Sequence, residues 1–211
     1  LEIVLYKKGV DRTLSDIGVT RFSARGVILA ALFSLLLLAF FPLFSLFTGI
    51  PLTLRGQWTW LMILTIFNIL SLEVMMRGFV FRHLRENWSF WRAAALPPLF
   101  YAVATAIAIV TAAQGLSLGS LLLSSLIPVP IGLLSAYLYE RGSNTLWGSV
   151  LLQFVVNALL STVITPASPI GFHQLFFYPM IGITSAIVVV WIYLRGFGRE
   201  TAPLPMEVIN P

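Results

Sequence analysis

Cysteine is absent from the chain, which excludes disulfide bonds, zinc sites built on thiolates and cysteine nucleophiles. Histidine is nearly as scarce and occurs only at His83 and His173. Neither histidine stands at metal-ligand spacing from a second ligand, so a histidine-based zinc site is not expected. We therefore expect no metal and no other cofactor.

Charged residues are also few. They form 10% of the chain, whereas 58% of its residues are hydrophobic. A soluble domain has roughly 25% charged residues, so this chain cannot cover a water-exposed surface. The formal net charge of +5 does not indicate nucleic acid, because the basic residues lie beside apolar runs instead of forming one surface. The expected partner of these basic residues is the anionic headgroup layer of a lipid bilayer.

The apolar runs predict an all-α integral membrane protein with about six transmembrane helices in one polytopic domain, residues 26–195. A basic segment precedes it at 1–25, either with weak strand or turn character on the membrane surface or as a solvated tail, and a tail follows at 196–211. The spans are expected at 26–48, from Trp58 to the basic residues that begin at Arg82, and at 93–111, 116–139, 146–164 and 175–194.

Prolines mark irregular points in three of these spans. Pro42 is expected to kink the first, and Pro97 and Pro98 to stand near the start of the third, where missing amide donors are tolerated. Pro128 and Pro130 fall within the fourth run, which predicts a kinked or discontinuous helix, either a packing kink or a cavity wall.

The basic residues also predict orientation, because cytoplasmic loops of membrane proteins are enriched in Lys and Arg. With six spans, all of the 13 basic residues except Arg55 fall on one side. We therefore expect both ends of this sequence to be cytoplasmic, in an inner membrane of prokaryotic type.

Glu73 and Arg77 place opposite charges inside apolar sequence. They are four residues apart, so on a helix they share a face, in the favourable order for an ion pair. Ionisable residues at membrane depth usually face a protein interior or a wet cavity. Two interpretations stay open, a functional site and a structural salt bridge.

Three of the expected spans carry polar residues at membrane depth, and the faces of the Glu73–Arg77 and Gln153–Asn157 pairs are expected to form one polar pocket. Gln153 and Asn157 are four apart and share a helix face. Hydrogen-bonding contacts between helices, with no further role, are the alternative for these two amides. The remaining polar residues are Asn68, Tyr101 and Thr105.

The order of these segments resembles the CAAX-protease and bacteriocin-processing family of intramembrane glutamic endopeptidases. The family's Glu-Glu-x-x-x-Arg-Gly motif is similar to segment 72–78, Leu-Glu-Val-Met-Met-Arg-Gly. Its Phe-x-x-x-His motif is similar to segment 100–104, and its His-x-x-x-Asn motif to segment 153–157, which follows a Tyr-x-Arg and Leu-Trp lead-in at 139–147. The resemblance implies the helical bundle of that family.

The catalytic positions depart from the family pattern. The resemblance aligns the family's water-activating Glu with Leu72 and its two histidines with Ala104 and Gln153. Alanine has no polar atom, and a glutamine amide cannot take up a proton near neutral pH. The retained motif residues are Glu73, Arg77 and Asn157. Glu73 is not expected to replace the missing base, because adjacent helical positions point about 100° apart and Arg77 already pairs with it.

This pattern favours a pseudoprotease that acts as a binding, assembly or regulatory subunit alongside another membrane protein. An active intramembrane endopeptidase of the CAAX-protease type is the first alternative. A transporter or channel component is the second, because transporters often use interrupted helices around sites at the membrane midplane.

Overall fold

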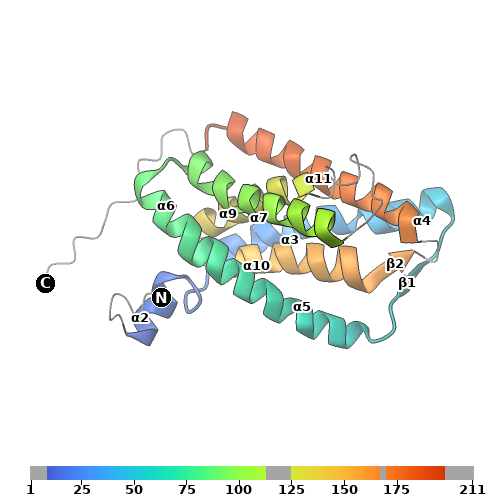
Figure 1. The fold of residues 1–211 in the computed structure, drawn as a ribbon, viewed down its shortest axis with the longest axis horizontal. Helices are drawn as coiled ribbons and strands as arrows, with labels where there is room; N and C mark the ends of the chain where they lie inside the picture. The colour runs from blue at the N-terminus through green and yellow to red at the C-terminus, as the bar shows by residue number, and fades with distance from the viewer. Residues whose placement is uncertain (1–8, 113–124, 167–169, 198–211) are drawn as a thin grey trace, which may run out of the picture.

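The computed structural model describes residues 9–112, 125–166 and 170–197. These residues form a bundle of helices with one short two-stranded ribbon (Figure 1). In chain order the elements are α2 (Val10–Asp16), α3 (Ala24–Leu38), α4 (Phe40–Thr48), β1 (Leu52–Leu54), α5 (Trp58–Glu73), η1 (Val74–Phe81), α6 (Arg82–Asn87), α7 (Phe90–Ala112), α9 (Pro128–Arg141), α10 (Trp147–Phe154), η2 (Val155–Val163), β2 (Ile164–Pro166) and α11 (Ile170–Leu194).

The all-α assignment is correct, and the protein is an integral membrane protein. Three helical stretches in the described part of the chain are long and apolar enough to cross a bilayer, namely Ala24–Thr48, Trp58–Asn87 and Phe90–Ala108. Two shorter apolar helices accompany them, at Trp147–Leu159 and Pro179–Leu194. Large apolar side chains face outward, such as Phe47 at 82% exposure and Phe100 at 72%, as expected for helices whose solvent is lipid.

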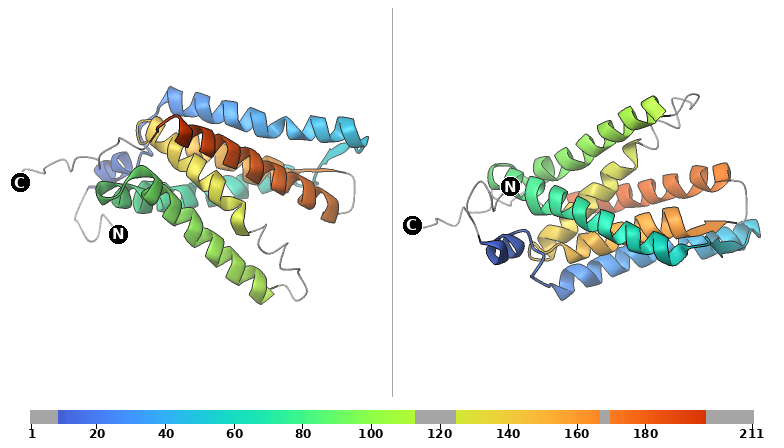
Figure 2. Two further views of the ribbon diagram at one scale, coloured as in Figure 1. Left: turned by 90° about the horizontal axis from the view of Figure 1, so that it is seen from above. Right: turned by 60° about the horizontal axis from the view of Figure 1, so that its bottom comes forward.

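Helix α9 is the central element of the bundle. It packs against α3, α7, α10, α11 and η1, and the two views in Figure 2 show it running between α7 and α11. Half of its 14 residues are buried, among them Leu134 and Leu138. Residues on opposite faces of α9 can therefore contact helices that are far apart in the chain.

Small residues bring α3 and α10 close together at the end of the bundle that carries α2. A Cβ on Gly148 would lie 2.8 Å from the backbone oxygen of Gly26, and a Cβ on Gly26 would lie 2.8 Å from Cα of Gly142. Close backbone approach at small residues is the usual packing mode of helices in membranes, where dispersion forces replace the hydrophobic effect. This contact sets the position of α10 and its polar face.

The first span breaks where Pro42 predicts a kink. Helix α3 ends at Leu38 and α4 starts at Phe40, with Ala39 between them. Proline has no amide hydrogen for the carbonyl of the residue four positions earlier, here Leu38. Beyond α4, β1 pairs antiparallel with β2, with Thr53 opposite Thr165, and joins the end of the first span to the end of η2.

Prolines also interrupt the fourth run at the predicted place. A helical pair at 125–126 is followed by a turn at Ile127, and α9 begins at Pro128 with Pro130 in its first turn. The first-turn amides of a helix have no intrahelical partner, so proline is compatible with this position. Residues 116–124 of the predicted span lie outside the described residues.

Two expectations about local structure were wrong. Helix α7 begins at Phe90, so Pro97 and Pro98 lie in its interior instead of near its start. Both side chains are buried, and Pro98 packs closely against Gly132 of α9. Within segment 1–25, residues 10–16 form helix α2 instead of a strand or turn.

Candidate functional site

Glu73 and Arg77 form the predicted ion pair inside the bundle. Glu73 is the last residue of α5, and Arg77 lies in the next turn, in η1. Arg77 Nη1 donates to Glu73 Oε1 at 2.8 Å. The side chains are 5% and 0% exposed. Burial in a low-dielectric environment strengthens such a pair but makes loss of one partner costly.

The guanidinium of Arg77 also ties η1 to α9. Its Nη2 donates to the backbone oxygen of Gly132 at 3.0 Å. A Cβ at position 132 would lie 2.4 Å from Pro98 Cβ and 3.3 Å from Arg77 Nη2. Glycine at 132 thus allows both the α7 proline and the arginine to reach the backbone of α9.

A second polar group joins α10 to the same stretch of α9. Gln153 Nε2 donates to Ser135 Oγ at 3.1 Å, and Ser135 is completely buried. Asn157 Nδ2 donates to Gln153 Oε1 at 3.0 Å and to the Gln153 backbone oxygen at 2.9 Å. Both ends of the Gln153 amide are therefore engaged.

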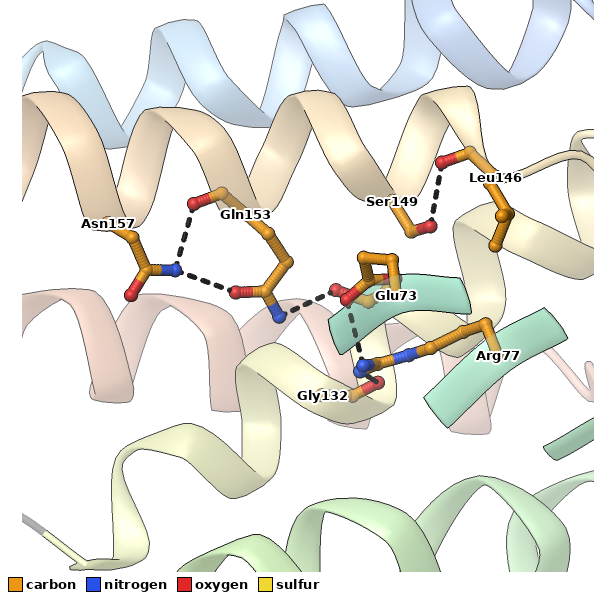
Figure 3. Close-up of polar contacts among 8 residues, drawn as sticks. Glu73, Arg77, Gly132, Leu146, Ser149, Gln153 and Asn157 are labelled. Carbon is orange, nitrogen blue, oxygen red and sulfur yellow. Dashed lines mark hydrogen bonds and ion pairs between the residues drawn. The ribbon is translucent and has the colours of Figure 1, made fainter. Parts of the chain in front are cut away.

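These two groups form one cluster, which we call the polar cluster: Glu73, Arg77, Gly132, Ser135, Gln153 and Asn157. Figure 3 shows Gln153 and Asn157 on one side of their helix, directed toward the Glu73–Arg77 pair. Gly132 and Ser135 are three residues apart on α9 and connect the halves. Asn157 lies at the open edge of the cluster, because its side chain remains exposed, and its amide joins the cluster through the two hydrogen bonds to Gln153.

Both motif helices contain π-helical segments at this cluster. Segment η1 starts directly after Glu73 and contains Arg77, and η2 contains Asn157. The π-helix is rare and often occurs at functional sites, because its i→i+5 bonding widens the turn and redirects side chains. The 3.6-residue period alone predicts an α-helix for both segments, and this prediction is wrong here.

One buried side-chain oxygen of the cluster has no hydrogen bond among the described residues. Glu73 Oε2 is buried and has no partner among the described residues. Ser149 lies one helical turn before Gln153 and is near this carboxylate in Figure 3, but its hydroxyl donates to the Leu146 backbone oxygen at 2.9 Å. Rotation of that hydroxyl would supply a donor to a carboxylate oxygen without moving either helix.

The remaining polar residues do not join the cluster. Asn68 and Tyr101 are exposed and Thr105 is half-buried. The positions that the resemblance aligns with catalytic groups also differ in environment. Leu72 is half-buried and Ala104 exposed, whereas Gln153 is buried.

Sequence reasoning missed Gly132, Ser135 and Ser149. A signal was present for Ser149, because positions 149, 153 and 157 repeat every four residues and share one helix face. Ser135 follows Gly132 by three residues, which also indicates a common face. No local pattern identifies the backbone oxygen of Gly132 as the acceptor for Arg77, because this contact joins residues 55 positions apart.

A second buried ion pair lies at the end of the bundle that carries α6. Arg85 Nε donates to Glu140 Oε2 at 3.0 Å, and Arg85 is 1% exposed. Arg85 Nη1 also donates to the Trp88 backbone oxygen at 3.0 Å. The pair connects α6 with the last turn of α9 and so supports the helices that carry the polar cluster.

The described residues contain no group of three His, Cys, Asp or Glu side chains that could hold a metal ion. His83 lies in α6, where its Nδ1 is 2.8 Å from the Phe79 backbone oxygen. His173 lies in the first turn of α11. The polar cluster can thus bind and orient groups through hydrogen bonds and one ion pair, with Glu73 as its sole ionisable acid.

Comparison with known protein families identifies a match. The sequence model of a family described as type II CAAX prenyl endopeptidase Rce1-like matches residues 54–159, half of the chain. The matched region includes α5, η1, α6, α7, α9 and α10 and therefore every residue of the polar cluster. No curated protein and no solved structure matches the chain.

Proposed function

The chain belongs to the Rce1-like family of type II CAAX prenyl endopeptidases, and from that membership we propose that it is a non-catalytic member, a pseudoprotease. It acts as a binding, assembly or regulatory subunit of a membrane complex. Three family positions carry this proposal. Leu72 stands where the family resemblance places the water-activating Glu, and Ala104 and Gln153 stand where it places the histidines.

The strongest support for this proposal is that polar atoms of the retained residues already form hydrogen bonds to other groups of the bundle. Arg77 donates to Glu73 Oε1 and to the Gly132 backbone oxygen, and Gln153 bonds to both Ser135 and Asn157. These bonds hold α9, α10 and η1 together. A general base must be within reach of a water and able to accept its proton, whereas these groups already serve as bonds between helices.

The expected partner is another membrane protein in the same bilayer. A bundle that keeps the helices of the family but lacks its histidines can still bind another protein, although it does not carry out the family's reaction. We further propose that the protein resides in a prokaryotic cytoplasmic membrane. The end of the bundle that carries α2 and the junction between α6 and α7 then faces the cytoplasm.

One observation favours a second candidate, an active endopeptidase that uses Glu73 as its base. Glu73 Oε2 is fully buried and has no hydrogen-bond partner among the described residues. A carboxylate oxygen in that state could accept a proton from a water in the polar cluster.

A cleavage assay separates the two candidates. Purified wild-type protein and the Glu73→Gln variant are incubated in liposomes with a panel of membrane and prenylated peptides. The pseudoprotease proposal expects no cleavage by either protein, with a catalytically active family member as the positive control. Glu86→Gln, the same chemical change on α6, controls for nonspecific effects. Wild-type cleavage that Glu73→Gln removes and Glu86→Gln retains would overturn the proposal.

A second experiment tests the role in assembly. Tagged protein is purified in a gentle detergent, with a tagged unrelated membrane protein as the control. The proposal expects one further membrane protein in a fixed ratio that survives a second purification step. Its absence from preparations whose fold is intact would count against a subunit role.

A further inference from the structure

The end of α9 carries a guanidinium that lacks an acidic partner. Arg141 is the last residue of the helix, and its guanidinium carbon lies 4.5 Å from the centroid of the Phe197 ring and 5.9 Å from that of the Tyr137 ring. Within the described part of the chain Arg141 makes no ion pair and no hydrogen bond, and the adjacent carboxylate, Glu140, is engaged by Arg85. Ring faces attract a cation, but they do not supply the oxygen acceptors that its N–H groups require.

The stack leaves one edge of this guanidinium open. Nε of Arg141 is buried, whereas its two terminal nitrogens are not, and the side chain as a whole is half-buried. Contact with the rings fixes the plane of the group, so the terminal N–H groups have a defined direction. Paired N–H groups of a guanidinium match two oxygens of a phosphate, which makes arginine a preferred ligand for that group.

The ring beneath Arg141 is held in place by three helix ends. Gly196 has a φ of +81°, and this left-handed residue ends α11 and turns Phe197 back onto the bundle. Trp91 Nε1 donates to the Phe197 backbone oxygen at 2.8 Å, and the Phe90 ring meets the Phe197 ring edge-on at 4.8 Å. The start of α7, the end of α9 and the end of α11 therefore meet at this stack, at one end of the bundle (Figure 2).

This end of the bundle coincides with a boundary of the apolar spans. The stretch Phe90–Ala108 begins here, and the apolar helix Pro179–Leu194 ends here. The rings of Trp91 and Tyr193 lie 5.4 Å apart beside the stack, and Trp and Tyr are enriched at the depth of the lipid headgroups. Arg141 is therefore placed at the depth where a bilayer carries its phosphates.

A second cation stands next to the stack. Arg195 lies two residues before Phe197, its side chain is exposed, and its guanidinium carbon is 4.9 Å from the Trp191 ring centroid. It too has no acidic partner among the residues that the structure describes. Two uncompensated positive charges at headgroup depth favour an anion.

We propose that Arg141 and Arg195 form a binding site for the phosphate group of one phospholipid, with Arg141 as the principal contact. Exposed apolar side chains of α11 lead from Arg195 along the membrane span, namely Ile187, Val190 and Leu194. An acyl chain can lie against them, which favours a phospholipid over a soluble phosphate ester. The proposal does not depend on whether the chain is catalytic.

Lipid titration of the delipidated protein in neutral detergent tests the site, with bound lipid counted by native mass spectrometry. Phosphatidylglycerol is the probe, diacylglycerol of the same chains lacks the phosphate, and glycerol 3-phosphate lacks the chains. We expect one phosphatidylglycerol to bind saturably per chain, with much weaker binding of diacylglycerol and no displacement by glycerol 3-phosphate at the same concentration. Equal binding of both lipids, or displacement by glycerol 3-phosphate, would overturn the proposal.

Two arginine variants locate the site on the chain. Arg141→Gln should weaken phosphatidylglycerol binding by about tenfold or more, the effect of losing a charged hydrogen bond. Arg195→Gln should weaken it by about fivefold, the contribution of one cation near a headgroup. Arg55→Gln, the same change on an exposed arginine before α5, should leave it unchanged.

Thermal unfolding without lipid separates binding from folding. A purely structural Arg141 would lower the unfolding temperature of Arg141→Gln while the folded variant kept its lipid affinity, and that result would overturn the proposal. Arg195 is exposed, so Arg195→Gln should unfold like wild type and decides the case if Arg141→Gln does not fold. Unchanged affinity in Arg195→Gln, or an equal loss in Arg55→Gln, would also overturn it.

Discussion

At the scale of single residues, the Glu73–Arg77 pair is the most sensitive point of the bundle. Glu73→Gln or Arg77→Met leaves one buried charge without its partner, and each should lower the free energy of unfolding by about 3–5 kcal/mol. The double variant should recover much of that loss, because no charge then remains to be desolvated. Reversible unfolding in mixed detergent micelles measures all three.

Arg55→Met is the control for this cycle. Arg55 is exposed in the loop before α5, so its removal should change stability by about 0.5 kcal/mol or less. A double variant that is as unstable as the sum of the two single variants would show that Glu73 and Arg77 do not act as a pair.

Gln153 is a separate residue-scale case, because its amide bridges two partners. Gln153→Leu removes the donor to Ser135 Oγ and the acceptor for Asn157 Nδ2. Interhelical hydrogen bonds in membranes contribute about 0.6–2 kcal/mol each, so a loss of about 1–3 kcal/mol in unfolding free energy is expected from the same assay. Asn87→Leu should be near neutral, and stabilisation by Gln153→Leu would refute the bridging role.

At the scale of elements, the segment after α2 holds the two motif helices together. Leu146 N donates to the Gly18 backbone oxygen at 3.1 Å, and Trp147 Nε1 donates to the Val19 backbone oxygen at 3.0 Å. On its other side, Ile17 lies against η1, where a Cβ on Gly78 would be 3.0 Å from Ile17 Cβ. Segment 17–19 thus lies between η1 and the start of α10.

Gly78→Leu should displace this segment. The added side chain would need space that Ile17 and its backbone occupy, and overpacking of this kind costs about 1–3 kcal/mol. Hydrogen exchange should show lost protection of the amide of Leu146, whose acceptor is Gly18. Gly56→Leu is the control, because nothing lies within 4 Å of a Cβ there. Unchanged protection at Leu146 in Gly78→Leu would contradict the contact.

The elements also show how far sequence reasoning reaches. Apolar length predicted the helical segments, and proline chemistry predicted the breaks near Pro42 and Pro128. Spacing predicted the Glu73–Arg77 pair because that contact is local. The π-helical segments and the link from Arg77 to Gly132 depend on contacts across the bundle. The local periodicity of the sequence carries no information about such contacts.

Exposure was the hardest property to predict. Asn68 and Tyr101 are both exposed, although polar residues at membrane depth usually face a protein interior. In a soluble protein, polarity separates the outer face from the core, but lipid-facing and core-facing sides of a membrane helix are both apolar. A single polar residue in such a helix therefore indicates a contact without indicating its direction.

At the scale of the whole molecule, most of the segments that carry basic residues lie at one end of the bundle. Helix α2, the junction between α6 and α7, and the end of α11 lie toward one end of the bundle, whereas the loop between β1 and α5, which contains Arg55, lies at the other (Figure 1). Lys and Arg are retained on the cytoplasmic side during insertion. The Arg-rich end is therefore expected in the cytoplasm.

Cysteine labelling in sealed inverted and right-side-out vesicles tests this orientation, and the cysteine-free chain needs no prior substitution. Ser89→Cys, between α6 and α7, and Ser143→Cys, in the turn after α9, should react with an impermeant maleimide from the cytoplasmic side. Gly56→Cys should react only from the opposite side. All three positions are exposed, so failure to label would not be due to burial. The proposed topology has an odd number of membrane crossings between Gly56 and Ser143, so the two residues should lie on opposite sides. Labelling of Gly56→Cys and Ser143→Cys from the same side would show that this topology is wrong.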